Sequence, residues 1–230
     1  MAPKILVVMT SHSKMGDSGK PTGWYLPELS HPYDVFSKAG ADMTFVSPKG
    51  GVAPLDPVSV EMFKSDPSAA NFFENHKDIW ENTKPLADFT DAADKFDAVF
   101  VPGGHGPMYD LYSDKTSLKI IGDFAAKGKV VAAVCHGPAA LINVTLPDGT
   151  PLLKGKECTG FSNVEEDQVQ LTPYMPFLME TELGKVSGGK YVKAPEPWGE
   201  NVIVSGNVIT GQNPASAHKI AEEVIKALKA

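Results

Sequence analysis

Cysteine is nearly absent from this sequence, and so are long apolar runs. Cys135 and Cys158 are the only cysteines in 230 residues, too few for the disulfide framework of a small secreted domain. No apolar stretch approaches the roughly 20 residues that a membrane-spanning helix needs. The opening residues, MAPKILVVMT, lack the layout of a signal peptide. We therefore expect a soluble protein of a reducing compartment, the cytoplasm, or the nucleus as well if the source is eukaryotic.

An excess of basic residues and the common nucleotide and metal motifs are also lacking. Lys and Arg number 21 against 28 Asp and Glu, a formal net charge of -7, whereas a nucleic-acid-binding surface is basic. There is no GxGxxG fingerprint and no P-loop, and the six histidines show no HExxH or CxxC spacing. These absences argue against a nucleic-acid partner and a nucleotide loop, and we expect no cofactor and no metal.

Short apolar runs alternating with helical patterns predict an α/β fold with a mostly parallel central sheet. Such runs are typical of strands that are buried on both faces. Buried strands are expected at residues 4–10, 43–47, 96–101 and 130–134, with a hairpin at 202–205 and 208–210. Helices are expected at about 29–39, 118–127, 173–186 and 215–228. The length and this βαβ rhythm predict one domain spanning residues 1–230.

Residues 48–95 interrupt the rhythm with Gly, Pro and charged residues, and we interpret them as an inserted, partly helical excursion. Phe72, Phe73 and Trp80 lie in this segment. We expect these aromatic side chains to pack against the main body of the protein and not to form a ligand site.

The stretch VVAAVCHGPAA, residues 130–140, predicts a strand, a sharp turn and a helix start, with Cys135 at the turn. A thiol near the N-terminus of a helix is close to unpaired amides and to the positive end of the dipole, which stabilise the thiolate. This placement indicates a nucleophile. A buried structural cysteine remains the alternative, because free cysteine is among the most buried residue types.

Polar residues follow several predicted strands and would meet at one edge of a parallel sheet: His12, Gly103 and Gly104, and Cys135 with His136. His136 could carry a proton for Cys135, but neighbours on a regular helix point apart, so the pair can act together only at an irregular turn. An acid orienting His136 would complete a Cys-His-acid arrangement.

Carboxylates occur at two predicted helix starts. Glu28 by position alone complements a helix dipole. The three adjacent acids Glu165, Glu166 and Asp167 are typical of a solvated helix start, and we expect at least two of them to be solvated.

Five motifs together resemble the ThiJ/PfpI superfamily: AVCHGPAAL, VPGGHG after FDAVF, the Glu in WYLPEL, GKECTGFSNVEE and VITGQNPASAHKIAEEV. They are most similar to its glutathione-independent glyoxalase III branch, which includes heat-inducible chaperone-like proteins. The resemblance implies a flavodoxin-like three-layer sandwich with helices on both faces of the sheet, and a homodimer.

Residue by residue, the resemblance gives Cys135 as the nucleophile, His136 as its neighbour and Glu28 as the acid against the thiol. Glu166 matches the acid that partners the histidine, with Glu165 as a rival. The oxyanion and substrate-binding positions fall in the GGH motif, at Gly103, Gly104 and His105, with a further amide near His136.

The resemblance implies conversion of methylglyoxal, or a related 2-oxoaldehyde, to lactate without glutathione. Such a lyase, of the D-lactate dehydratase type, would protect against carbonyl stress. Two alternatives stay open: a stress holdase that uses exposed apolar surface around Phe72, Phe73 and Trp80, and a redox sensor in which Cys135 is oxidised beside Glu28.

Overall fold

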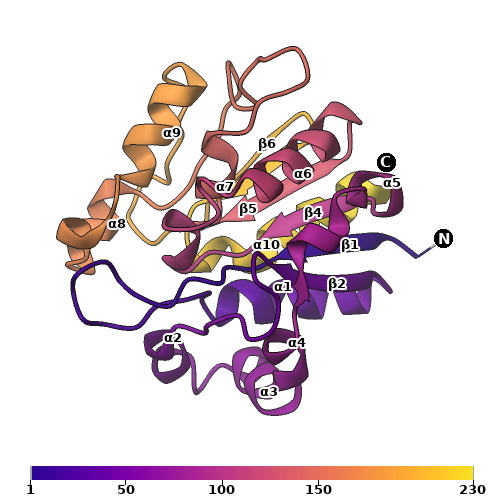
Figure 1. The fold of residues 1–230 in the computed structure, drawn as a ribbon. Helices are drawn as coiled ribbons and strands as arrows, with labels where there is room; N and C mark the ends of the chain where they lie inside the picture. The colour runs from indigo at the N-terminus through magenta and orange to yellow at the C-terminus, as the bar shows by residue number, and fades with distance from the viewer. Residues whose placement is uncertain (1, 230) are drawn as a thin grey trace.

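The computed structural model describes residues 2–229, and its strands form one seven-stranded sheet (Figure 1). The strands are β1 Lys4–Val8, β2 Asp42–Ser47, β3 Lys84–Pro85, β4 Ala98–Val101, β5 Val130–Val134, β6 Val202–Ser205 and β7 Val208–Gly211. Their order is β3-β2-β1-β4-β5-β7-β6. All neighbours pair in parallel except β6 and β7, which form an antiparallel hairpin. The predicted α/β class and mostly parallel sheet are confirmed.

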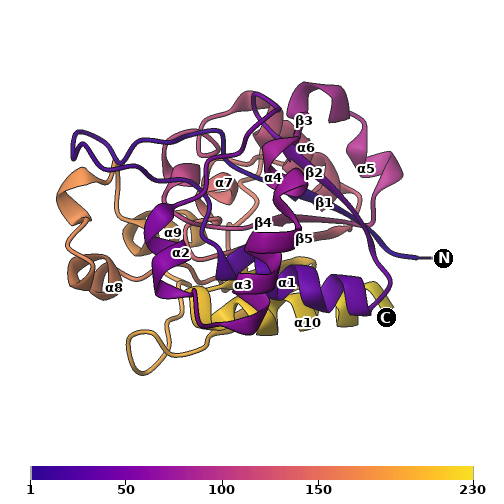
Figure 2. The same cartoon turned by 90° about the horizontal axis from the view of Figure 1, so that it is seen from below.

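Helices cover both faces of this sheet (Figures 1 and 2). Their bounds are α1 Pro27–Lys38, α2 Pro57–Met62, α3 Pro67–Asn75, α4 Lys77–Glu81, α5 Ala92–Lys95, α6 Lys115–Ala126, α7 Ala139–Ile142, α8 Asn163–Gln168, α9 Met179–Ser187 and α10 Ala217–Lys229. The helix expected over 173–186 starts later, at Met179, because Pro173 and Pro176 interrupt the preceding residues. No helix among residues 2–229 combines the length and apolarity that crossing a membrane requires.

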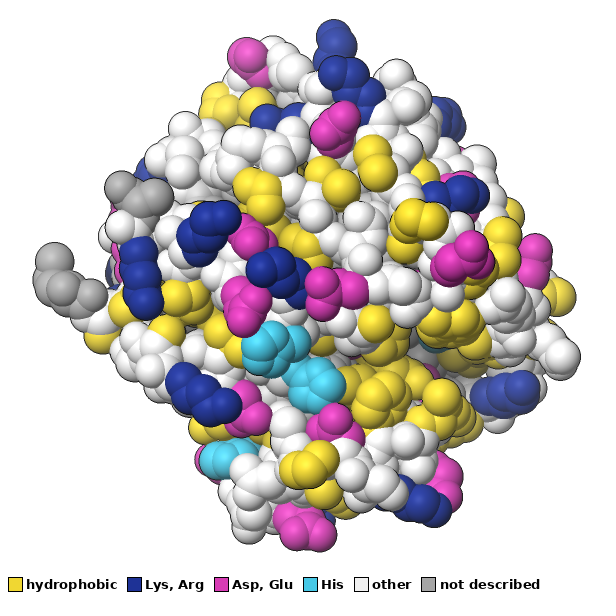
Figure 3. Space-filling model, turned by 180° about the vertical axis from the view of Figure 1, so that it is seen from behind, with side chains coloured by type: hydrophobic (Ala, Val, Ile, Leu, Met, Phe, Trp, Pro, Cys, Tyr) yellow, Lys and Arg dark blue, Asp and Glu magenta, His cyan; other side chains and the backbone are white. Residues whose placement is uncertain are grey.

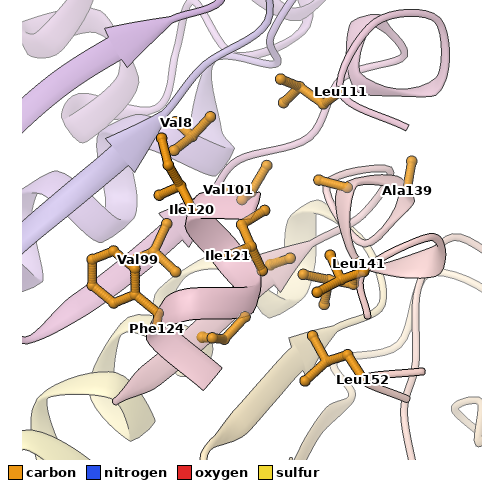
Figure 4. Close-up of a cluster of buried hydrophobic side chains, with 14 of the residues drawn as sticks. Val8, Val99, Val101, Leu111, Ile120, Ile121, Phe124, Ala139, Leu141 and Leu152 are labelled. Atoms are coloured by element: carbon orange, nitrogen blue, oxygen red, sulfur yellow. The ribbon is translucent and has the colours of Figure 1, made fainter. Parts of the chain in front are cut away.

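The alternating side chains of each central strand supply two cores. From β1, Leu6 and Val8 pack on the face that carries α6, whereas Ile5 and Val7 pack on the face that carries α1 and α10. Figure 4 shows part of the first core, where Ile120, Ile121 and Phe124 of α6 meet Val99 and Val101 of β4. Every residue of β4 and β5 is buried, as their continuous apolar runs predict.

The chain reverses its winding direction between β1 and β4. Helix α1 leaves β1 toward one face of the sheet, and α6 leaves β4 toward the other. In open parallel sheets this reversal opens a crevice at the carboxyl ends of the strands, where ligands bind. The residues that follow β1, β4 and β5 therefore gather at one edge.

The excursion at residues 48–95 forms α2 to α5 and the edge strand β3. Phe72 and Trp80 are 1% and 5% exposed and pack with Trp24 in the core beneath α1. The expectation that these aromatics pack against the main body is confirmed. On the back face of the molecule, lysines and acidic side chains are interspersed (Figure 3), and on α10 Lys219 pairs with Glu222 and Glu223.

Candidate active site

Cys135 lies at a strained turn directly after β5. Its backbone φ is 60°, a left-handed conformation that residues other than glycine rarely adopt. Two backbone hydrogen bonds hold the turn in place. The Cys135 amide donates to Gly211 O at 2.9 Å, and the Cys135 carbonyl accepts from Phe161 N at 2.9 Å. Gly137 is required here, because a Cβ would lie 2.3 Å from Val101 O. The helix that follows, α7, has only four residues.

This turn brings two adjacent side chains together. The Cys135 Sγ atom lies 3.3 Å from Nδ1 of His136, and Nε2 of His136 lies 2.6 Å from Oε2 of Glu166. Desolvation of Glu166 acts to raise its pKa, but the two imidazoles facing it together outweigh burial and hold the pKa of that carboxyl well below its usual value, so it is ionised. An ionised carboxylate can only accept, which assigns the proton to Nε2 and leaves Nδ1 free to accept from the thiol. The arrangement is a Cys-His-Glu triad.

His105 is a second histidine on the same acid. Its Nε2 lies 2.9 Å from Oε1 of Glu166, and its ring centroid lies 4.0 Å from that of His136. The family resemblance gives His105 as an oxyanion or substrate-binding residue, and His105 does line the cavity. Its hydrogen bond to Glu166 shows that it also helps to orient the acid of the triad.

Burial decides the protonation of the thiol and the imidazole. Desolvation lowers the pKa of His136 to about 4, with a further contribution from His105, while the charge of Glu166 acts in the opposite direction. Desolvation also raises the pKa of the Cys135 thiol, and the neighbouring Glu28 carboxyl raises it further when that carboxyl is ionised. The expectation of a thiolate stabilised by a helix N-terminus is therefore wrong for the resting site, because the sulfur is enclosed and α7 is a single turn. The structure favours a thiol that loses its proton to His136.

Glu28 faces this thiol from the first turn of α1. It is fully buried, and desolvation raises its pKa to about 8, although the Cys135 thiol and the amides of Gly103 and Gly104 oppose the shift. Neither carboxyl oxygen has a hydrogen-bond partner of good geometry among the described residues. A carboxyl group in this state is mostly protonated at neutral pH, so it can donate a hydrogen bond toward the sulfur.

The adjacent acids Glu165 and Glu166 have separate roles. Glu165 belongs to a capping box with Ser162 at the start of α8 and also accepts from Gln212, Asn213 and the amide of Trp198. Glu166 alone reaches the histidines. Both are buried, at 0% and 3% exposure, so the expectation that at least two of the three acids are solvated is wrong. Their burial is satisfied by donors from distant segments, which the sequence does not reveal.

Glycines allow the loop after β4 to touch the turn after β5. A Cβ on Gly103 would lie 2.5 Å from Oε2 of Glu28 and 2.8 Å from the amide nitrogen of His136. Gly104 has a φ of 82°, and its Cβ would lie 2.2 Å from Gly23 O. Among residues 2–229, no backbone carbonyl accepts from the amides of Gly104 and His136, and the Gly104 amide faces the Glu28 carboxyl, whose pKa it lowers. Both amides lie where an oxyanion could accept from them.

A small cavity opens beside the thiol, with a volume of about 50 Å³. Part of its lining is the polar groups already described. The rest of the lining is mostly apolar and was missed from the sequence; it is formed by Tyr25, Phe161, Val169, Trp198 and Pro214. Tyr25 and Phe161 lie inside the motifs WYLPEL and GFSNVEE, which could have identified them. Trp198 and Val169 carry no such signal.

The ligand atoms of His105, His136 and Glu166 lie within 4.8 Å of one another, a spacing that could hold a metal ion. Each imidazole instead directs its Nε2 at a carboxylate oxygen, so hydrogen bonding accounts for the spacing. A metal ion would have to replace both hydrogen bonds.

Comparison with known proteins adds to this geometry. The sequence profile of the DJ-1/PfpI family matches residues 23–227. The chain is 34% identical to "Glyoxalase 3" of Candida albicans over 98% of both chains. It is 33% identical to "Glutathione-independent glyoxalase HSP31" of Saccharomyces cerevisiae over 100% of both. The crystal structure of glyoxalase III from Candida albicans superposes with a TM-score of 0.86 at 32% identity, covering 98% of this chain and 97% of that one.

Proposed function

The chain belongs to the DJ-1/PfpI family, and we propose that within it the chain is a glutathione-independent glyoxalase. Its substrate is methylglyoxal or a related 2-oxoaldehyde, and its product is lactate. The observation that carries this proposal is the buried thiol of Cys135, placed 3.3 Å from an imidazole nitrogen that can accept its proton. The full-length similarity to two glyoxalases supports the same activity.

The reaction begins with addition of sulfur to the aldehyde. His136 Nδ1 takes the thiol proton as the Cys135 sulfur attacks the aldehyde carbon, and Glu166 stabilises the imidazolium that forms. The aldehyde oxygen becomes an oxyanion, which the amides of Gly104 and His136, neither of them bonded to a backbone carbonyl, stabilise. Protonation of this oxygen gives a hemithioacetal.

An internal proton transfer follows. His136, neutral again, removes the proton from the former aldehyde carbon and gives an enediolate. The hydroxyl proton of that carbon passes to the neighbouring oxygen, and His136 returns its own proton to the adjacent carbon. The product is a thioester of lactate on Cys135. Water cleaves the thioester, releasing lactate and the free thiol, so the net change is the addition of one water to methylglyoxal. Glu28, protonated beside the sulfur, can donate a hydrogen bond toward it during these steps, and no step calls for glutathione.

The experiment is methylglyoxal consumption and lactate formation by the purified protein in the absence of glutathione. Cys135→Ala should lose activity by about 10³-fold or more, because the nucleophile is gone. Cys158→Ala is the matched control, since Cys158 is a buried cysteine outside the cavity. Full activity in Cys135→Ala would end the proposal. The resemblance also supports a homodimer, which sedimentation tests.

A holdase is the second candidate. The aromatics Phe72 and Trp80 are buried and cannot serve it, but the same segment exposes Val52, Val58 and Met62 at 64%, 58% and 66%. Suppression of aggregation that survives Cys135→Ala and is lost in a Val58→Ser, Met62→Ser double variant would assign it. A redox role for Cys135 predicts instead a stable increase in mass after mild peroxide treatment, with no turnover.

A further inference from the structure

Trp198 is an unusual part of the cavity wall. It lies in the Pro- and Gly-containing segment before β6, its side chain is 41% exposed, and its φ of 64° is left-handed. Exposed tryptophans normally need no fixed position, yet this one lines the cavity beside the thiol of Cys135.

Three contacts hold Trp198 in place. Its amide donates to Oε1 of Glu165 at 2.8 Å, and its indole Nε1 donates to Oε1 of Gln168 at 2.6 Å. Its ring meets Phe161 edge-on at 5.4 Å. Two of these contacts come from α8, the helix that also supplies the acid of the triad. The same helix therefore positions both the indole and Glu166.

Phe161 connects this wall to the chemistry. Its ring centroid lies 4.4 Å from that of His136 and 5.4 Å from that of Trp198. The two aromatic rings therefore bound the space in which the substituent of a bound 2-oxoaldehyde would lie once its aldehyde carbon reaches the sulfur.

The size of that space is restrictive. A buried water needs roughly 10–15 Å³ of comparable volume, so a cavity of about 50 Å³ has room for about four water-sized groups. This matches a molecule as small as methylglyoxal. A phenyl ring beside the dicarbonyl is larger than this space, and Trp198 is one of the residues that line it.

We infer that Trp198 is a specificity-determining residue that limits the site to 2-oxoaldehydes with short aliphatic substituents. The inference rests on the proposed glyoxalase function for its substrate class, and on the fixed position of the indole for its size limit. Glu165 and Gln168 act through Trp198 as positioning residues.

The test compares kcat/KM for methylglyoxal and phenylglyoxal in Trp198→Ala, Trp198→Phe and the wild type. The phenylglyoxal to methylglyoxal ratio should rise about tenfold or more in Trp198→Ala, the range expected when part of an apolar pocket is removed, and less in Trp198→Phe. Tyr174→Ala, which removes an exposed aromatic outside the cavity, should leave the ratio unchanged. A ratio within twofold of the wild type in Trp198→Ala, or an equal loss for both substrates, overturns the inference.

A second measurement is independent of catalysis. Iodoacetamide and its N-benzyl derivative share one reactive group and differ in bulk, and peptide mass separates alkylation of Cys135 from that of Cys158. Trp198→Ala should accelerate the benzyl reagent at Cys135 more than iodoacetamide, and equal acceleration of both contradicts the size limit. If no variant turns over an oxoaldehyde, the glyoxalase proposal fails while this comparison still decides the role of Trp198.

Discussion

His136 directs Nδ1 at the sulfur of Cys135, its immediate neighbour in the chain, across 3.3 Å. Adjacent residues on a regular helix or strand point apart. The contact exists because Cys135 takes a left-handed φ of 60° between β5 and the short helix α7. Backbone strain at this one residue thus places nucleophile and base together, and the buried sheet behind it holds the strain.

Glu166→Gln should mainly lower kcat, whereas Glu165→Gln should mainly lower stability, although the two residues are adjacent. Glu166→Gln removes the charge that stabilises imidazolium on His136, so kcat should fall by about 10²–10⁴-fold with a small change in melting temperature. Glu165→Gln disturbs a capping box and leaves buried donors without a matching acceptor, which should lower the free energy of unfolding by about 1–3 kcal/mol. Its kcat should fall less than that of Glu166→Gln. Paired kcat and urea-unfolding measurements check this, and a larger loss of kcat in Glu165→Gln would reverse the assignment.

The pH profile of kcat/KM should be limited by His136 and Glu28. His136 must be neutral to accept the thiol proton, and its pKa of about 4 predicts loss of activity below that pH. Glu28 must be protonated to face the sulfur without repulsion, and its pKa of about 8 predicts a decline above that pH. Glu28→Gln should lower the plateau less than Cys135→Ala does and should abolish the alkaline decline. An unchanged decline in that variant would assign it to another group.

Glu28 should also make stability depend on pH. Its pKa is raised in the folded protein, from 4.5 to about 8, so the unfolded chain binds fewer protons between these values. Its contribution to the free energy of unfolding is complete below pH 4.5 and is lost as the pH rises through 8. Relative to Glu28→Gln, the wild type should therefore lose stability over this window, by at most about 5 kcal/mol. Urea unfolding of both proteins at pH 5 and pH 9 measures this loss. If the difference in unfolding free energy between the two proteins is the same at both pH values, the raised pKa of Glu28 is refuted.

Gly104→Ala should be much more damaging than Gly149→Ala. Both glycines have a φ of 82°, so both variants pay the same backbone strain, but a Cβ meets Gly23 O at 2.2 Å only at position 104 and meets nothing within 4 Å at 149. We expect a loss of about 1 kcal/mol at Gly149 from strain and a several-fold larger loss at Gly104, together with loss of activity. Equal losses in urea unfolding would show that the close approach of the two loops is unimportant.

Much of the fold could be predicted from the sequence because its signals are local. Buried parallel strands are continuous apolar runs, and β1, β2, β4 and β5 all lie within the predicted segments to within about two residues. The elbow could be read in the same way, since a strand followed at once by Cys-His-Gly-Pro leaves room only for a turn. The candidate residues Cys135, His136, Glu28 and Glu166 came from matching motifs, and the fold brings all four to one place.

Other properties depended on contacts between distant segments. Nothing in the run FSNVEE separates Glu165 from Glu166. In the structure, Glu165 accepts hydrogen bonds from residues 198, 212 and 213, all more than thirty positions away, whereas Glu166 bonds to the histidines. The protonated state of the thiol follows from burial, and a helix N-terminus read from sequence predicts the opposite. The indole of Trp198 belongs to a loop without periodicity. Sequence alone placed Cys135, His136 and the Gly103-Gly104 loop at one edge of the sheet. Tertiary packing decided which acid joins them, their charges and the size of the space between them, because desolvation and steric exclusion depend on every neighbouring segment.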